Sequence, residues 1–390
     1  MIPTPFELAP LGSICDLNPR LPKESRPADT DLVSFVPMAA VDEESASISA
    51  AEIRAYSAVK KGFTPFRDND VLFAKITPCM ENGKVALATG LHGGIGFGST
   101  EFHVLRASAR VLPEWLRYYV LRPSFRSQAK RRMSGAVGQQ RVPAEFLSES
   151  LIPIPPVDEQ RKLVEFLARA ENIVRMRREA EQKATELIPA LFLDMFGDPG
   201  TNPKGWGIES LAEVAAIESP LRTPNFVTEA NEVCIGPDSI ESMTGQLLSQ
   251  PTVGDIRPIS GKYRYRCRDV LYSKIRPALV KVALAPSDGY CSADMYPLRC
   301  GPKLQPEYLM QILLNRHFTR YALDRATRAQ MPKINREALF AFRLPVPPID
   351  LQESFARHCQ GYMRVREQQR TAMGTAELAF QSLLARVFGE

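Results

Sequence analysis

The chain carries one long sequence pattern twice, and this duplication restricts its fold more than any other feature. The run Asp70–Pro78 (DVLFAKITP) returns as Asp269–Pro277 (DVLYSKIRP), and Ile152–Asp158 (IPIPPVD) returns as Leu344–Asp350 (LPVPPID). The period of about 190 residues is far longer than the roughly 20–50 residues of a solenoid repeat. The sequence therefore predicts two copies of one domain arrangement, with an internal pseudo-twofold repeat.

The first part of each copy combines strands with helices. Within residues 1–156, a helix is expected over Pro113–Leu121, because proline is tolerated in a first helical turn. Residues 199–348 repeat this mixed α+β arrangement. The two copies differ most over residues 31–67 and 229–266, where different binding preferences could lie. Short apolar runs bounded by turn residues predict strands at Val71–Phe73, Val85–Leu87 and Phe102–Leu105.

The second part of each copy predicts a long helix, over residues 157–198 and 349–390. Apolar residues recur there in steps of three, four or seven, and the two helices are expected to pack antiparallel in a coiled-coil-like pair. Pro189 should kink or split the first helix, because its ring clashes with the preceding turn. The expected apolar stripes are Leu163, Phe166, Ala170, Ile173, Ala180, Ala184, Leu187 and Leu191, and Phe355, His358, Tyr362, Val365, Ala372, Ala376, Ala379 and Leu383.

Composition restricts the class of protein. The net charge of +5 over 390 residues permits a nucleic-acid partner without requiring one. The seven cysteines form no CxxC pair and do not match between the copies, so we expect reduced thiols and a cytoplasmic protein. No stretch approaches 18 consecutive apolar residues, and the first residues do not resemble a signal peptide. We expect no membrane partner.

The sequence shows no active site. None of the four histidines has metal-ligand spacing, and we expect His358 to be packed in a core. The run Gly93–Gly98 superficially resembles a dinucleotide loop, but Ser99 stands where the last glycine belongs, so we expect a flexible loop. Asp68, Asp70 and Lys75 lack the second acidic residue of a nuclease motif. We therefore predict no catalytic, cofactor or metal site in this chain.

Basic residues recur at equivalent places in the two copies. Arginine can bridge guanine O6 and N7, and glutamine can bridge adenine N6 and N7. Lysine and arginine both bind phosphates. The alternative for the helix runs is a solvated helix face. For the second recurring group it is a packing role, with buried stems and charged ends at the surface; this group is Lys75, Thr77, Lys84, Lys274, Arg276 and Lys281. Predicted phosphate contacts are Lys75, Arg131, Arg132, Lys274, Arg325 and Arg328, and predicted contacts closer to base edges are Gln139, Gln140, Arg141 and Gln330. Thr77, Lys84, Arg276, Lys281 and Lys333 complete the predicted DNA-binding set.

With these features in place, the chain resembles the specificity subunit of type I restriction–modification systems over nearly its whole length. The resemblance rests on the Pro-x-Pro-Pro-Val/Ile-Asp-x-Gln runs at Pro153–Gln160 and Pro345–Gln352. Each follows a basic and apolar pair, Arg141–Val142 or Lys333–Ile334. The run Met195–Pro199 (MFGDP), at the end of the first long helical stretch, is equally typical of this family. It is the set of motifs, twice and in order, that carries the likeness.

The resemblance implies that residues 1–156 and 199–348 are target recognition domains, each reading one half of an asymmetric, two-part DNA target. Residues 157–198 and 349–390 would be conserved spacer helices that bind two methyltransferase (modification) subunits. Restriction/translocase subunits would complete the assembly on double-stranded DNA. This chain would bind no cofactor, whereas the partner subunits would use S-adenosylmethionine, ATP and Mg²⁺.

Two other classes of function remain open at this point. A protein scaffold could hold two partners without reading DNA, and a compact DNA-modifying enzyme could contain a cryptic site.

Overall fold

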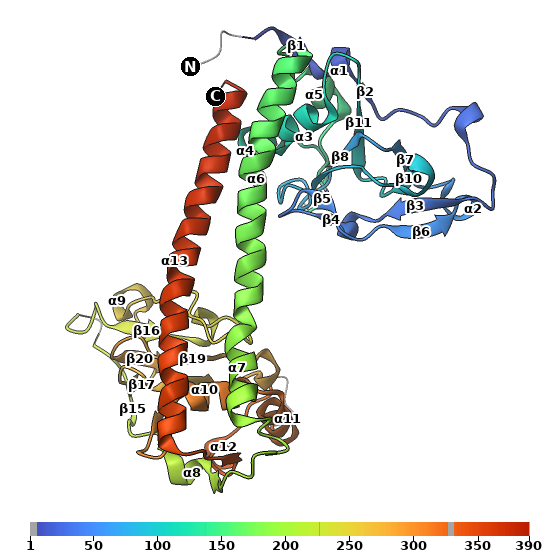
Figure 1. Cartoon of the computed structure of the whole chain (residues 1–390). Coiled ribbons are helices and arrows are strands. Elements are labelled where there is room, and N and C mark those ends of the chain that lie inside the picture. Colours follow the sequence, from blue (N-terminus) through green and yellow to red (C-terminus); the bar gives the residue numbers. More distant parts are fainter. Residues whose placement is uncertain (1–5, 137, 226, 327–330, 390) are drawn as a thin grey trace. The chain divides into compact units, whose positions relative to one another are not determined.

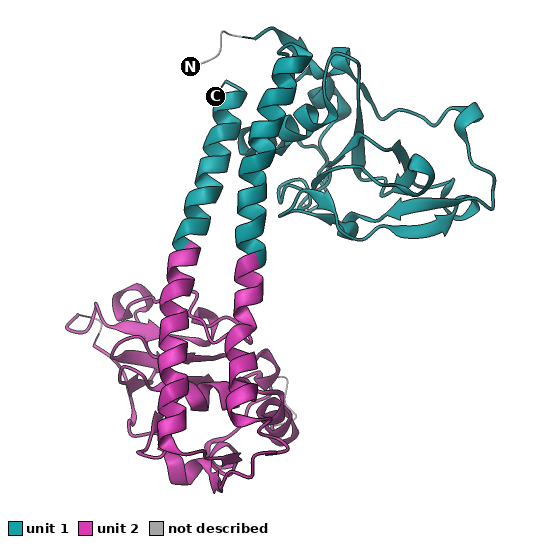
Figure 2. Cartoon of the chain, viewed as in Figure 1, with its two compact units in different colours: residues 1–179, 371–390 teal, residues 180–370 magenta. Residues whose placement is uncertain are grey.

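The computed structural model describes residues 6–136, 138–225, 227–326 and 331–389 (Figure 1). The chain divides into two compact units (Figure 2): unit 1 is residues 1–179 with 371–390, and unit 2 is residues 180–370. Each unit combines sheets, short helices and part of both long helical segments. The predicted α+β class, with two long helices, is confirmed.

One four-stranded sheet of unit 1 (the antiparallel sheet) includes the three predicted strands and one that was not predicted. Its order is β2–β11–β8–β9, and all neighbours are antiparallel. Helix α3 (Pro113–Leu121) begins at the predicted proline and buries Trp115 and Leu116 in the core. The strands are β2 (Cys15–Leu17), β8 (Asp70–Ala74), β9 (Val85–Leu87) and β11 (Phe102–Ala107).

Unit 2 repeats this sheet in the order β14–β21–β18–β19, again with antiparallel neighbours. Helix α10 (Pro306–Leu314) takes the place of α3 and buries Tyr308 and Leu309. The repeated order follows from the repeated sequence, because the same apolar runs pair in the same register. The strands are β14 (Ala215–Ala216), β18 (Val270–Ser273), β19 (Val282–Leu284) and β21 (Met295–Cys300).

Each unit also has a second four-stranded sheet that contains one parallel pair (the mixed sheet), and here the copies differ. A parallel pair with an antiparallel third strand is common to both: β3–β10–β7 in unit 1 and β16–β20–β17 in unit 2. The fourth strand joins opposite edges, β6 beside β3 but β15 beside β17. The strands are β3 (Leu32–Val36), β6 (Glu52–Ala55), β7 (Thr64–Arg67) and β10 (Ile95–Gly98), and β15 (Leu221–Arg222), β16 (Val233–Ile235), β17 (Lys262–Tyr265) and β20 (Gly289–Ser292).

The prediction of a flexible loop over Gly93–Gly98 is wrong for most of its length, because Ile95–Gly98 forms strand β10. A Cβ atom added at Gly96 would collide with the ring of Phe66 on the neighbouring strand. Gly289 lies under Tyr265 in the same way in unit 2. The glycines therefore allow an aromatic ring to pack directly on the backbone of a strand.

Short elements complete each unit. Strand β1 pairs with β12, and β13 pairs with β22, so the first part of each copy closes its beginning onto its end. These strands are β1 (Leu8–Pro10), β12 (Leu151–Pro153), β13 (Ile208–Ser210) and β22 (Arg343–Pro345), and a small ribbon joins β4 (Val41–Asp42) to β5 (Ser47–Ile48). The short helices are α1 (Leu11–Ile14), α2 (Tyr56–Val59), α4 (Pro123–Arg132), α5 (Ala144–Glu149), α8 (Leu211–Val214), α9 (Val253–Ile256), α11 (Arg316–Arg325) and α12 (Arg336–Phe340).

The first long helical segment is split, as Pro189 predicts. Helix α6 (Val157–Thr185) ends and α7 (Leu187–Phe196) begins around Glu186. The proline ring would clash with the carbonyl of Thr185, four residues earlier, and it has no N–H to donate. The second segment, α13 (Ile349–Val387), runs for 39 residues.

The long helices run antiparallel within each unit. In unit 1, Arg178 of α6 pairs with Glu377 of α13, while Phe388 packs on Trp115 at 4.4 Å between ring centroids. The Trp115 indole donates to the carbonyl of Pro153, just before α6 begins. The C-terminal end of α13 therefore lies near the start of α6.

Unit 2 gives the same direction with different residues. Tyr362 of α13 donates its hydroxyl hydrogen to the carbonyl of Ala184 at 2.7 Å. Eight residues after Ala184, Phe192 of α7 packs on Phe355, with ring centroids 5.7 Å apart. Phe355 lies earlier in α13 than Tyr362, so the two segments run in opposite directions. The predicted antiparallel pairing is confirmed.

The predicted apolar stripes are partly wrong about which helix face is buried. Phe166 and Ile173 are about half exposed, and the exposed His358 lies next to the buried Cys359. The residues that pack are one position away, because a pattern with many apolar and alanine positions fits two adjacent faces. The buried helix residues are Gln160, Leu167, Val174, Ile188, Phe192 and Phe196, and Gln352, Phe355, Ala356, Cys359, Phe380 and Leu384.

Candidate nucleic-acid interface

In unit 1 the fold brings two of the predicted groups together. The amide of Thr77 donates to the carbonyl of Gln140 at 3.0 Å, and the amide of Val142 donates to the carbonyl of Lys75 at 2.9 Å. Ser134 and Arg141 exchange two backbone hydrogen bonds that close the loop between them. Lys75 and Thr77 therefore lie directly beside the loop between Ser134 and Arg141, which comes much later in the chain.

Arg141 is held by a carboxylate that the sequence did not single out. Its Nε and Nη2 donate to the two carboxylate oxygens of Glu101, at 2.9 and 2.7 Å. The hydrogen bonds from Arg141 lower the pKa of Glu101 below its ordinary value and keep it ionised. The Arg141 side chain is still 43% exposed. The only signal in the sequence was that Ser99–Glu101 recurs as Ser292–Asp294.

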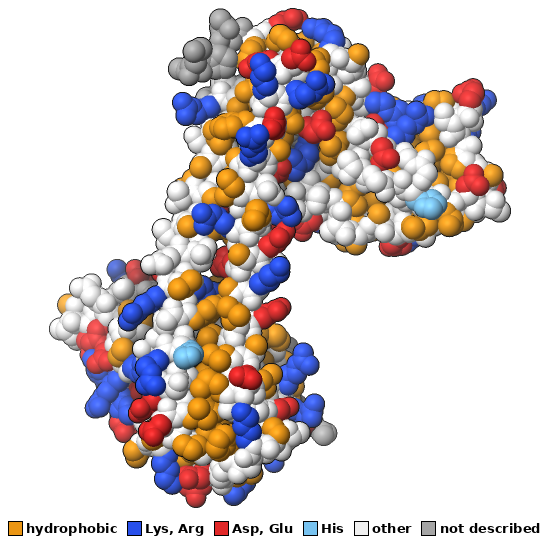
Figure 3. Space-filling view, in the orientation of Figure 1, with side chains coloured by type: hydrophobic (Ala, Val, Ile, Leu, Met, Phe, Trp, Pro, Cys, Tyr) orange, Lys and Arg blue, Asp and Glu red, His pale blue; other side chains and the backbone are white. Residues whose placement is uncertain are grey.

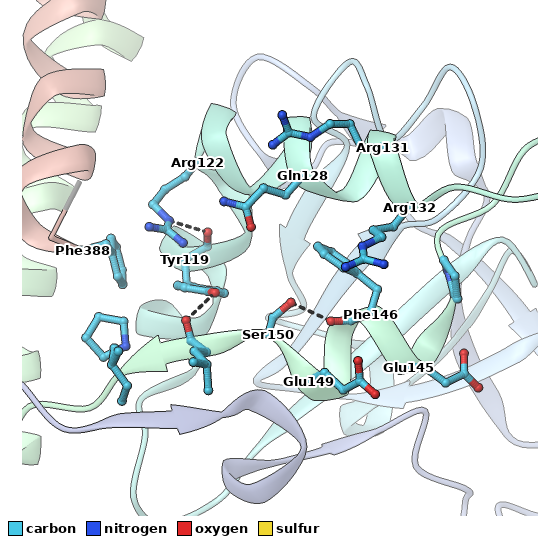
Figure 4. Close-up of a pocket in the computed structure, with 14 residues that line it drawn as sticks. Tyr119, Arg122, Gln128, Arg131, Arg132, Glu145, Phe146, Glu149, Ser150 and Phe388 are labelled. Carbon is cyan, nitrogen blue, oxygen red and sulfur yellow. Dashed lines mark hydrogen bonds between the residues drawn. The ribbon is translucent and has the colours of Figure 1, made fainter.

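Helix α4 carries further cations. Arg131 and Arg132 are exposed, and within the described residues neither has a carboxylate partner. Together with Gln128 they form one wall of a groove of about 800 Å³, whose other wall carries Glu145 and Glu149 (Figure 4). The predicted phosphate contacts on α4 are therefore accessible to a ligand.

Arg126, also on α4, is a cation that the predicted set omits. Its Nη1 donates to the carbonyl of Glu81 at 2.9 Å, while its Nε is buried and has no partner in the described part of the chain. Burial lowers the pKa of Arg126, because the charged form loses its hydration.

Unit 2 places its predicted residues in the same relation. The amide of Ile334 donates to the carbonyl of Lys274 at 3.0 Å, and the amide of Arg276 donates to the carbonyl of Pro332 at 2.7 Å. The guanidinium of Arg325 lies 3.8 Å from the ring centroid of Tyr321. Exposed cations on α11 that the predicted set omits are Arg316 and Arg320. The predicted residues Arg328 and Gln330 lie outside the described residues.

Two predicted contacts have another use in the fold. The ammonium of Lys84 donates to the carbonyl of Val41, and that of Lys281 donates to the carbonyl of Pro237, each at 2.8 Å. Their side chains are 17% and 15% exposed. This geometry favours the alternative packing role, in which each lysine holds a neighbouring turn; contact with DNA stays a prediction.

Two searches of the described residues gave negative results. Histidine, cysteine, aspartate and glutamate do not gather there in groups of three or more that could hold a metal ion. Among the same residues, no helix is long and apolar enough to cross a membrane.

Comparison with known proteins identifies relatives of this arrangement. Residues 3–186 match the model of the type I restriction modification DNA specificity domain. The chain is 30% identical over 260 residues to the specificity subunit of the Escherichia coli type I restriction enzyme EcoAI, covering 66% of this chain and 41% of that protein. The EcoDI specificity subunit, also from Escherichia coli, is 32% identical over 190 residues, 48% of this chain and 42% of that protein. The matched region thus spans about two fifths of these relatives.

Solved structures share the fold at low sequence identity. A chain from a study of complex assembly and conformational transition of the type I R-M system is 21% identical, with a TM-score of 0.61. The match covers 100% of this chain and 98% of that one. The S subunit of a type I restriction–modification system from M. genitalium is 13% identical, with a TM-score of 0.53 and coverage of 99% and 96%.

Proposed function

The chain belongs to the family of type I restriction–modification specificity subunits, and from this premise we propose that it is the sequence-specific DNA-binding subunit of such a complex. Each unit reads one half of a two-part target in double-stranded DNA. The target is asymmetric, because the mixed sheets of the two units differ in sequence and in which edge carries the fourth strand.

The observation that carries this proposal is the recurrence of exposed cations beside polar loops. In unit 1, Arg131 and Arg132 end α4 just before the loop that contains Gln139 and Gln140. In unit 2, the equivalent helix α11 carries exposed arginines, including Arg325 at its end. Cations of this kind bind phosphates, and neighbouring polar side chains can reach base edges.

Exposed apolar side chains on the long helices supply docking faces for two methyltransferase subunits. In unit 1 these are Phe166 and Ile173 on α6 and Leu378 on α13, which is 74% exposed. In unit 2 they are Leu187 and Leu193 on α7 with Met363 and Val365 on α13, where apolar side chains gather along the helices (Figure 3). Contiguous exposed apolar surface marks sites of protein association. Restriction/translocase subunits then join the complex.

The chemistry resides in the partner subunits. This chain is non-catalytic and binds no cofactor in our proposal, while the partners use S-adenosylmethionine, ATP and Mg²⁺. The exposed apolar faces also favour a second candidate, a scaffold that holds two proteins without reading DNA.

A binding experiment separates these functions. We expect the purified chain to bind duplex DNA with a strong salt dependence, and the binding to sharpen when methyltransferase subunits are co-expressed. Mapping of methylated bases in the host genome should then reveal a two-part motif that is lost when the chain is deleted. No DNA binding at low salt, even with the partners, would favour the scaffold. Methylation or cleavage by the chain alone would instead identify an enzyme.

A further inference from the structure

Contacts that recur in both units show which ion pairs the fold requires. Buried Asp70 accepts hydrogen bonds from Nε and Nη2 of Arg106, at 2.8 and 2.6 Å. Asp269 repeats this with Arg299, at 3.0 and 2.8 Å. Asp70 lies in β8 and Asp269 directly before β18, and each pair reaches the neighbouring strand of the antiparallel sheet. Both pairs are retained although much of the surrounding sequence has changed.

The pair between Arg141 and Glu101 does not recur in this way. Their backbone places do recur. The backbone amide of Lys75 donates to the Glu101 carbonyl, and the backbone amide of Lys274 donates to the carbonyl of Asp294. The side chains at the unit 2 places are Asp294 and Lys333, which cannot form the same fork, because lysine carries a single ammonium. The forked form of the pair is therefore not required by this backbone setting.

The hydrogen bonds of Arg141 leave a defined edge of the guanidinium open. Of its five N–H groups, Nε–H and one on Nη2 go to Glu101, and one on Nη1 goes to the carbonyl of Gln139 at 3.1 Å. Within the described residues, one N–H on Nη1 and one on Nη2 remain without a partner. Arginine that keeps two N–H donors can bridge the O6 and N7 acceptors of guanine.

The charge around this edge also suits DNA. Glu101 is ionised and lies between Arg141 and Lys75, so the three side chains together carry one net positive charge. The carboxylate is 24% exposed, whereas the guanidinium it holds is 43% exposed. The carboxylate therefore fixes the orientation of Arg141 while the arginine presents its open edge to solvent.

We propose that Glu101 is a positioning residue that presents Arg141 to one guanine in the major groove of the half-site read by unit 1. This inference rests on the proposed function and adds to it the identity of one base contact. Unit 2, with Asp294 and Lys333 at the corresponding places, reads its half-site without such a fork. The first half-site therefore contains a G·C pair whose recognition depends on both members of the pair.

The test uses the full chain co-expressed with its methyltransferase subunits. The motif is first obtained by mapping methylated bases, and binding is then measured on duplexes that carry each single base-pair change. We expect Glu101→Gln and Arg141→Lys to lose about 5- to 100-fold of discrimination at the same G·C position, the range for one bidentate contact. All other positions and the salt slope should stay unchanged.

One variant serves as the control. Glu7→Gln removes a carboxylate from another exposed arginine pair of unit 1, Glu7 with Arg110 at 3.3 Å, and should leave every position unchanged. Arg141→Lys retains the positive charge, so it carries the test if Glu101→Gln does not fold. Thermal melting of each variant identifies folded protein.

The outcomes separate this inference from the proposed function. Uniform weakening on all duplexes with a smaller salt slope would make Arg141 a phosphate contact and overturn the inference. Unchanged discrimination in both variants would make the pair structural and also overturn it, while the two-part motif of the wild-type complex would still support the function. A wild-type complex that prefers no duplex would overturn both.

Discussion

His103 lies buried between two polar neighbours, and its neutral form satisfies both. Its Nε2–H donates to the carbonyl of Val142 at 2.8 Å, and its Nδ1 accepts from the side-chain amide of Asn18 at 3.1 Å. Burial lowers the pKa of His103 below its ordinary value, because a protonated ring would lose its hydration. Protonation of Nδ1 would remove the acceptor for Asn18, so the ring satisfies both neighbours only while it is uncharged.

This arrangement predicts a pH dependence of stability. The unfolded chain binds a proton at His103 below about pH 6.5, whereas the folded chain binds it only at lower pH. The free energy of unfolding should therefore fall as the pH drops below about 6.5, and level off below the folded pKa. Urea unfolding of His103→Tyr, which introduces the residue found at the equivalent position 296, should remove this component. His358→Gln, a change at an exposed histidine, should retain it; equal profiles for all three proteins would contradict the prediction.

Alanine variants of Arg131 and Arg132 test whether these arginines contact phosphates. Alanine at either position should weaken binding to all duplexes equally and reduce the slope of log K against log salt by about one, because one fewer counterion is released. The double variant should reduce the slope by about two. Arg110→Ala removes the same charge from another exposed site of unit 1 and serves as the control. If its slope changes as much, the effect is one of net charge and not of contact.

At the scale of elements, the repeated Pro-Pro motif ends in a glutamine that ties each long helix to its unit. Gln160 is fully buried; it accepts from the amide of Leu112 and donates to the carbonyls of Arg110 and Pro155. Gln352 makes the corresponding three hydrogen bonds in unit 2, to Gln305, Lys303 and Pro347. Each glutamine thus joins a helix start to the segment before α3 or α10.

Removal of either glutamine should be costly. Gln160→Ala leaves one amide and two carbonyls without their partner, so we expect unfolding to become easier by roughly 3 kcal/mol. Gln352→Ala should cost a similar amount in unit 2. Gln128→Ala, at an exposed position on α4, should stay within about 0.5 kcal/mol of wild type in urea unfolding. Equal stability of all three variants would show that other groups or water replace these hydrogen bonds.

At the scale of the whole molecule, each unit contains its own hydrophobic core and its own copy of the predicted contact group. Residues from both long helical segments contribute to each core, Leu167 and Leu384 in unit 1 and Phe192 and Phe355 in unit 2. A change in helix length therefore does not have to alter either set of DNA contacts.

We predict that the helices set the spacing between the half-sites. Inserting seven residues after both Ala180 and Ala372 adds about 10 Å of helix at 1.5 Å per residue. The preferred DNA spacer should then lengthen by about 3 base pairs at 3.4 Å each. Both half-sites should be retained and act as internal controls in methylation mapping. An unchanged spacer would show that these helices do not measure distance.

The sequence by itself determined the duplication, most of the element types and the resemblance to a known family. These depend on local properties: strand runs such as Val85–Leu87, a helix that begins at Pro113, and a helix break caused by Pro189. Because each property acts within a few residues, one sequence is sufficient to predict it. The motifs recur in order, so the resemblance to specificity subunits also needed no coordinates.

Only the tertiary structure decided which surfaces are buried and which side chains meet. Leu167 faces the core while neighbouring Phe166 is exposed, because packing partners choose between two adjacent helix faces that the pattern fits equally. Gly96 lies in strand β10, and the ring of Phe66 packs directly against its backbone. Glu101 holds Arg141 across 40 residues of chain, and Lys84 holds a carbonyl 43 residues earlier. Contacts at such separations depend on how the sheets and loops come together, and no local pattern encodes them.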